Sequence, residues 1–364
     1  MEILKGIKPV FILISIAALL VAIWAGWIRL GWPFPYAHPT LPLVHGPLMI
    51  SAFLGTLISL ERAVAINKLW MYLAPLLSGL AALALLFGID NGLIVPVLFS
   101  LSSIILVLMF IQIIRQHPAI HTIIMGLGSL AWMIGNLLWL YSWPFPQLVL
   151  WWVAFLVLTI AGERLELNRI LKHPKPVFYA FDFIIVLYLV GLSLSAILLL
   201  LGTRINSLAM LFLAIWLFLF DIARKTIRLS ELPRYIAFCL ITGYIWLGTG
   251  GILGVIYGGY SAGLYYDAFL HAIFVGYVIS MIFGHGPIIF PSILGVSIEY
   301  SKILYIPLIL LHISLVLRIS GDLLLISQLR LVGGLLNGVA IVLFLIIMAG
   351  KIVRSRRKLA TGVS

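Results

Sequence analysis

The sequence has very little charge and a single cysteine. Only 9% of its 364 residues are Asp, Glu, Lys or Arg, whereas soluble domains carry about 25%. Cys239 alone cannot supply a disulfide framework, a cysteine-ligated iron–sulfur cluster or a CxxCH haem attachment within this chain. Ser-His-Asp arrangements, phosphate loops and Rossmann fingerprints are also missing. The sequence therefore supports no conventional soluble-type catalytic site and leaves open whether the protein is an enzyme.

Hydrophobic residues, in contrast, make up 63% of the chain. Apolar runs of about 18–25 residues recur from end to end, each long enough to cross roughly 30 Å of hydrocarbon. No small-residue cleavage site follows the first run, so we expect a retained first helix. The predicted fold class is all-α, a single polytopic transmembrane domain over residues 1–364 with about twelve helices. We expect them at 9–31, 43–66, 70–89, 93–114, 119–141, 145–168, 177–202, 206–226, 233–258, 264–286, 301–319 and 325–352.

The 23 Lys and Arg residues fall mainly on one side of this topology. With the N-terminus inside, only Arg29, Arg204, Arg318 and Arg330 lie in outer segments, as the positive-inside rule requires. We therefore predict a multi-pass protein of the cytoplasmic (inner) membrane with both termini in the cytoplasm. The net charge of +12 then has a topological origin, and the expected neighbours are anionic headgroups of the lipid bilayer rather than nucleic acid.

One segment of the chain is echoed by another. The sequence HGPLMISAFLG at 45–55, in the second predicted span, resembles HGPIIFPSILG at 285–295, which follows the tenth. A further similarity links the second span to the sixth. The second, sixth and tenth spans follow one another at intervals of four helices. The helices could therefore form three arcs of four, although chance similarity between apolar segments explains the echoes equally well.

The similarity between the second and sixth spans consists of charged residues near the predicted inner helix ends. Glu61 and Arg62 close the second span, and Glu163 and Arg164 close the sixth. Ionisable groups in a membrane cost about 2.5 kcal/mol or more each, so they are rare and often functional. These four residues are either ion-paired helix ends at the interface or the entry to a proton path.

His271 and His45 are the strongest candidates for ligands of a cofactor. His271 lies inside an apolar run, and Asp267 precedes it by four residues, which places the carboxylate on the same helix face. Carboxylates commonly orient metal-bound imidazoles. His45 lies at a similar predicted depth, on a face of small residues that suits either close helix packing or a flat cofactor. A bis-imidazole site for haem b or copper between the two histidines is therefore geometrically allowed.

His285 and His312 are secondary metal-ligand candidates. His285 follows His271 by 14 residues, which on a straight helix is a turn of about 40° and a rise of roughly 21 Å. These two side chains could therefore mark the ends of a polar path but could not bind one ion. His312 lies near the predicted centre of the membrane, where a ligand or proton-relay role is expected.

Two of these segments resemble a known family. The sequence HAIFVG at 271–276, followed by GHG at 284–286, resembles a run near the end of NnrS-type membrane proteins. His45, at the start of a Gly-rich helix, resembles the early histidine region of the same group. That family is associated with haem, copper and tolerance of nitric oxide stress, so the resemblance implies a haem- or copper-binding protein.

A more distant similarity is to subunit I of the haem–copper oxidases, which also has twelve helices in three arcs of four. There, histidines on the second and tenth helices hold the low-spin haem, and the matching positions here are His45 and His271. The oxidases carry further histidines for their copper centre on the sixth, seventh and tenth helices. Here the sixth and seventh spans, 145–168 and 177–202, contain no histidine, and the corresponding residue of the tenth span is Ile273. The resemblance therefore does not extend to oxygen reduction.

Three functions remain open from the sequence. The first is a haem-binding or copper-binding protein in nitric oxide or respiratory redox physiology, active in electron transfer or in gas sensing and binding, with a redox partner. The second is a proton-coupled membrane transporter, because Gly-Pro interruptions near ionisable residues are typical of broken transporter helices. The third is a non-catalytic subunit that assembles with other membrane subunits.

Overall fold

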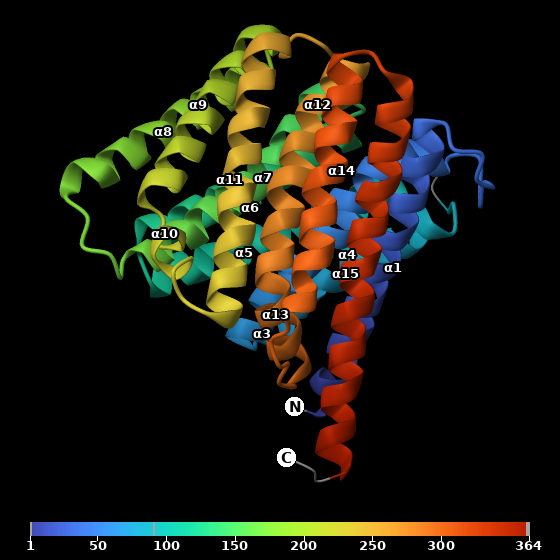
Figure 1. Ribbon diagram of the computed structural model, residues 1–364, viewed down its shortest axis with the longest axis vertical. Helices are drawn as coiled ribbons and strands as arrows, with labels where there is room; N and C mark the ends of the chain where they lie inside the picture. Colours follow the sequence, from blue (N-terminus) through green and yellow to red (C-terminus); the bar gives the residue numbers. More distant parts are fainter. Residues whose placement is uncertain (1, 90–91, 362–364) are drawn as a thin grey trace. The chain divides into compact units, whose positions relative to one another are not determined.

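Figure 1 shows the computed structural model, which describes residues 2–89 and 92–361. These residues form helices and no strands, and twelve of the helices are long and apolar enough to span a membrane. The prediction of an all-α polytopic membrane protein is therefore confirmed. The spans are Gly6–Leu30, Leu41–Ile66, Leu69–Leu86, Ile94–Gln116, Ile120–Leu140, Phe145–Asn168, Lys175–Ser195, Leu199–Phe220, Glu231–Tyr257, Leu264–Leu294, Lys302–Leu323 and Ser327–Arg357.

The chain divides into two compact units, unit 1 (Met1–Gly162) and unit 2 (Glu163–Ser364), with the boundary inside α7 (Phe145–Asn168). Unit 1 contains α1 (Glu2–Leu30), η1 (Leu41–Val44), α2 (His45–Pro47), η2 (Leu48–Gly55), α3 (Thr56–Ile66), η3 (Leu69–Tyr72), α4 (Leu73–Leu86), α5 (Ile94–Gln116) and α6 (Ile120–Leu140). Unit 2 contains α8 (Lys175–Ser195), α9 (Leu199–Phe220), α10 (Ala223–Thr226), α11 (Glu231–Tyr257), α12 (Leu264–His271), η4 (Ala272–Ile279), α13 (Ser280–Leu294), η5 (Lys302–Leu304), α14 (Tyr305–Leu323) and α15 (Ser327–Thr361).

Small residues bring the helices of each unit close together. In unit 1, Gly55 lies against the ring of Trp132, so that a Cβ atom there would clash with the indole. In unit 2, α8 packs on α9 and α14 packs on α15. A Cβ atom at Gly191 would meet the backbone of Asn206, and one at Gly333 would meet the backbone of Arg318. Without water to drive helix association in lipid, this close backbone approach supplies much of the packing energy.

Two of the spanning helices contain a π-helical segment, η2 and η4, each eight residues long. η2 follows the short helix that begins at His45, and η4 directly follows His271. π-helical turns are rare and occur often at functional sites. Hydropathy does not reveal them, because the widening of a helix changes its hydrogen bonding and not its average polarity.

The tenth spanning helix is longer than the sequence indicates. It continues through Pro287 and Pro291 to Leu294, and Gly295 ends it in a left-handed conformation with φ of 65°. The expectation that this helix ends near Gly286 is therefore wrong. The expected angle between the His271 and His285 directions, which was calculated for a straight α-helix, is also wrong. The π-helical segment η4 lies between the two residues and interrupts the α-helical geometry.

Large apolar side chains cover much of the surface of the described helices. Among them, Leu13 is 66% exposed, Phe183 63% and Ile346 62%. Such exposure is unfavourable in water and favourable in hydrocarbon. The surface therefore fits a lipid bilayer, as the sequence predicts.

Candidate functional site

The His45 side chain is anchored on α1. Its Nδ1 atom lies 2.7 Å from the backbone oxygen of Ala22. One turn further along α1, a Cβ atom at Gly26 would lie 2.8 Å from the His45 Cε1 atom, so only glycine leaves room for the ring. The half-buried imidazole is thereby held by a hydrogen bond and by shape.

This hydrogen bond defines the proton position on the His45 ring. A carbonyl oxygen only accepts, so Nδ1 carries the hydrogen and donates it to Ala22. In the neutral imidazole, the lone pair that binds metals then resides on Nε2. His45 consequently has the tautomer that a haem iron or copper ligand requires.

His271 has the same tautomer and a carboxylate beside it. Its Nδ1 atom lies 2.9 Å from the backbone oxygen of Asp267 and 3.3 Å from Oδ1 of the same residue. Both side chains are mostly buried, with 16% of His271 and 22% of Asp267 exposed. A carboxylate at the distal nitrogen makes the imidazole a stronger electron donor through Nε2.

Arg318, on α14, holds this carboxylate in place. Its Nε and Nη2 atoms donate to Oδ2 of Asp267 at 3.2 Å and 2.8 Å. Near the same end of α14, Asp322 lies 3.0 Å from Nε of Arg330. Asp267 was expected from its spacing to His271, whereas its partner Arg318 was missed. The available signal was an arginine inside an apolar run, which requires a counter-ion.

His285 also donates from Nδ1, to the backbone oxygen of Met281 at 2.8 Å. It lies on α13, half-buried, with the π-helical segment between it and His271. Among the residues that the structure describes, no three His, Cys, Asp or Glu side chains come together as a metal site. The predicted role of His285 as an additional metal ligand stays a prediction.

His312 differs from the other three histidines. Nε1 of Trp246 donates to its Nδ1 atom at 3.0 Å, so this nitrogen must be unprotonated. In the neutral ring the hydrogen is then on Nε2, which is buried and has no hydrogen-bond acceptor in the described part of the chain. This tautomer favours a hydrogen-bond donor over the metal ligand that the sequence suggests. Trp246, on α11, was not foreseen as its partner.

Arg164 forms a buried ion pair within unit 2. Its Nε and Nη2 atoms donate to the two carboxylate oxygens of Asp221 at 2.9 Å and 3.1 Å, and only 3% and 0% of these side chains are exposed. Asp221 Oδ1 also accepts the backbone N–H of Ala223 at 2.7 Å, and the Asn168 side chain accepts that of Ile222 at 2.9 Å. The arrangement ties the end of α7 to the turn between α9 and α10.

The other predicted charged residues lie at helix ends. Glu61 and Arg62 are half-buried near the end of α3, where the Arg62 guanidinium carbon lies 5.8 Å from the centre of the Phe110 ring. Such a geometry is typical of a cation–π contact. Glu163 is half-buried, next to Arg164. A proton path through these residues stays a prediction.

The family comparison covers nearly all of this architecture. A model of the family described as Domain of unknown function (DUF8744) matches residues 8–353. The chain belongs to this family. None of the curated proteins matches the chain. The matched range includes His45, His271 and Asp267, but the family description names no activity, so function must be argued from the geometry of the site.

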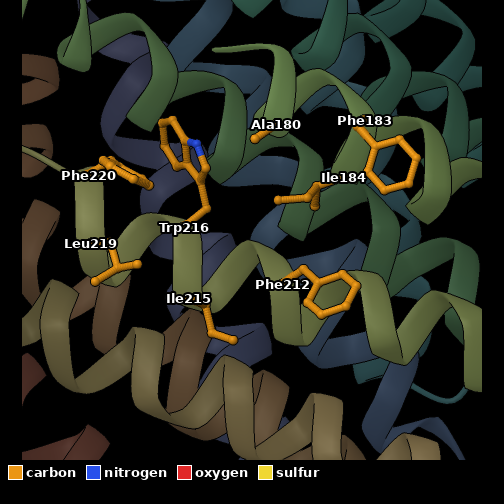
Figure 2. A pocket seen from close by; sticks show the side chains of 8 residues that line it. All are labelled: Ala180, Phe183, Ile184, Phe212, Ile215, Trp216, Leu219 and Phe220. Carbon is orange, nitrogen blue, oxygen red and sulfur yellow. The ribbon is translucent and has the colours of Figure 1, made fainter. Parts of the chain in front are cut away.

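A shallow groove between α8 and α9 offers no comparable chemistry. Figure 2 shows its eight lining side chains, all apolar except for the indole nitrogen of Trp216. That nitrogen already donates to the backbone oxygen of Val177 at 2.8 Å. The groove, of about 300 Å³, therefore contains no group that could ligate a metal. The histidines remain the better candidates.

Proposed function

We propose that this protein binds haem b through histidine and acts in nitric oxide or respiratory redox physiology, as an electron-transfer or gas-binding protein. The observation that carries the proposal is the geometry of His271. Its Nδ1–H is held by the backbone and carboxylate of Asp267, so Nε2 presents the lone pair. Imidazole nitrogen is the most common axial donor to haem iron in oxygen-binding and electron-transfer proteins.

The surroundings of His271 suit a cofactor ligand. Asp267 would increase the electron density on the imidazole, which favours the oxidised, more positive iron. Arg318 in turn fixes the carboxylate with two hydrogen bonds. A ligand oriented by two successive shells of contacts is typical of metal sites that control redox potential.

His45 supports the same proposal from unit 1. It shares with His271 the Nδ1–H donor tautomer and the nearby π-helical segment. The resemblance to NnrS-type proteins and to oxidase subunit I also points to this pair of histidines. We propose Nε2 of His45 as a further candidate metal ligand, and copper as the alternative metal for either residue.

The first test is the visible absorption spectrum of the protein, purified in mild detergent after expression with ample haem. We expect a Soret band, with sharp α and β bands after reduction by dithionite. The His271→Ala and His45→Ala variants should lose or change these bands. His117→Ala is the matched control, because His117 is exposed at the end of α5 and should leave the spectrum unchanged.

The spectrum also distinguishes the ligand sets. A low-spin, six-coordinate spectrum that becomes high-spin in either variant would indicate two axial histidines and electron transfer. A five-coordinate spectrum lost only in His271→Ala would indicate one ligand and gas binding. A colourless wild-type protein without iron or copper would contradict the proposal and leave the proton-coupled carrier as the function to pursue.

A further inference from the structure

Asp322 is a fully buried acid within a membrane-spanning helix. It lies near the end of α14, and none of its side chain is exposed. α14 packs against α12, which carries Asp267, and against α15, which carries Arg330. A charge in this position is expected to be paired and hydrogen-bonded, because hydrocarbon gives it no solvation.

The nearest cation does not provide that hydrogen bond. Nε of Arg330 lies 3.0 Å from Oδ1 of Asp322, but its N–H group is not directed at the oxygen. Both carboxylate oxygens of Asp322 and Nε of Arg330 are buried without a hydrogen-bond partner in the part of the chain that the structure describes. Distance alone makes an ion pair, whereas a strong hydrogen bond also requires alignment.

A second carboxylate lies beside Asp322. Arg318, which donates to Asp267, precedes Asp322 by four residues on α14 and therefore lies on the same face of that helix. Asp267 already accepts two hydrogen bonds from Arg318 and lies 3.3 Å from Nδ1 of His271. The ionised form of Asp267 is therefore the better stabilised of the two. Burial and the neighbouring negative charge disfavour the ionised form of Asp322.

Neighbouring carboxyl groups in a medium of low dielectric constant share a proton, because two adjacent negative charges cannot both be solvated. We infer that Asp322 is a proton-binding site, in which the neutral acid donates its hydrogen to the carboxylate of Asp267. The proton is taken from hydronium of the aqueous phase, which leaves a water molecule, and no other covalent bond changes. Asp267 stays ionised between Arg318 and His271, and Arg330 remains as the facing cation.

This assignment gives unit 2 a buried, exchangeable proton that does not depend on any cofactor. Proton carriers within membranes are commonly acids on spanning helices that face other helices rather than lipid. Asp322 meets this description, whereas Asp221 does not. Asp221 accepts two hydrogen bonds from Arg164 and one from Ala223, so its anionic form is fully satisfied.

Infrared spectroscopy of the full-length protein tests the inference directly. A protonated carboxylic acid absorbs above the amide bands and moves to lower frequency in heavy water. We expect such a band in the wild type and its loss in Asp322→Asn, which imitates the neutral acid in shape. Asp182→Asn is the control, since Asp182 lies on another spanning helix, α8, and its loss should leave the Asp322 band in place.

A second variant covers the case in which Asp322→Asn does not fold. Asp322→Glu retains a carboxylic acid and should shift the band rather than remove it. An acid band that is unchanged in both variants would overturn the inference. A wild-type-minus-variant difference spectrum with bands of ionised carboxylate only would overturn it as well. The measurement requires no haem, so a colourless protein would leave this result intact.

Discussion

Among single side chains, the histidines differ in which ring nitrogen is the donor. His45, His271 and His285 donate from Nδ1 to a backbone oxygen, whereas His312 accepts at Nδ1 from Trp246. Because a neutral imidazole carries one hydrogen, these contacts assign the lone pair to Nε2 in the first three and the hydrogen to Nε2 in the last. Nε2 can therefore act as a metal ligand in the first three histidines and as a hydrogen-bond donor in His312.

The carboxylate beside His271 leads to a prediction for Asp267→Asn. The variant should still bind haem, because the backbone oxygen of Asp267 continues to accept from Nδ1. Loss of the negative charge should weaken the ligand, lower haem affinity by about 10–100-fold and raise the reduction potential. Haem titration and a potentiometric titration measure the two effects. An unchanged potential would show that the carboxylate does not act on the iron ligand.

A residue far from the ligating nitrogen should also matter. In Gly26→Ala, the new Cβ atom would lie 2.8 Å from Cε1 of His45, so the ring must move and its bond to Ala22 weakens. We expect a loss of about 1–3 kcal/mol in the free energy of unfolding, together with an altered absorption spectrum. Denaturant titration in detergent measures the first effect.

Gly79→Ala is the matched control for this change. Gly79 also lies in a helix of unit 1, but its nearest neighbours, Ile14 and Phe11, are 3.8 Å or more from the new Cβ atom. Stability should be unchanged or should increase by up to about 1 kcal/mol, because alanine is the better helix former. Equal losses in both variants would contradict a specific role for Gly26.

At the scale of elements, polar contacts within unit 1 surround the π-helical segment η2. The backbone oxygen of Ser51 accepts from the Ser78 hydroxyl at 2.9 Å. The Ser51 hydroxyl accepts from Trp132 at 3.1 Å. Thr56 donates to Ser78 at 2.8 Å, which fills the small-residue face with helix–helix contacts. For this part of the helix, close packing is the better interpretation than space for a flat cofactor.

The Arg164–Asp221 pair connects α7 with the turn after α9 and leads to the prediction at this scale. Arg164→Met leaves an uncompensated buried carboxylate, and we expect a loss of about 3–5 kcal/mol. The double variant Arg164→Met, Asp221→Leu should recover much of this loss, since it removes both charges. Thermal unfolding in detergent compares the three proteins. A double variant as unstable as the single one would show that the hydrogen bond from the Ala223 N–H to Asp221 dominates.

For the whole molecule, the main prediction concerns topology. In a Cys239→Ala background, Ser230→Cys and Ser261→Cys place single thiols on exposed positions before and after α11. With both termini in the cytoplasm, an impermeant thiol reagent should label Ser261→Cys from outside intact cells. Ser230→Cys should react only after permeabilisation. The reverse pattern would contradict the orientation inferred from Lys and Arg.

Much of the architecture could be predicted because lipid imposes a simple length rule. An apolar run of about 20 residues must form a helix, since hydrocarbon leaves no other way to satisfy its backbone. The boundaries were less accurate where local chemistry is ambiguous. The tenth span was expected to end at residue 286, yet the helix continues through Pro287 and Pro291 to Leu294.

The candidate site could be predicted only as far as contacts along one helix. The four-residue spacing of Asp267 and His271 anticipated that they share a face, and the structure places the carboxylate 3.3 Å from Nδ1. Partners from other helices were missed. Arg318 for Asp267, Asp221 for Arg164 and Trp246 for His312 are separated by 51, 57 and 66 positions, and hydropathy contains no information about such pairs.

The sequence by itself determined the membrane class of this protein, the number of spanning helices and the few polar residues that its apolar runs contain. These properties depend on composition and length, which act locally along the chain. Only the tertiary structure decided which nitrogen of each histidine carries the hydrogen, where helices widen into π-helical segments and which acid lacks a hydrogen bond. The contacts of His45 with Ala22 and of His312 with Trp246 join different helices at 2.7 Å and 3.0 Å, a separation that hydrogen bonding requires and that no local pattern specifies.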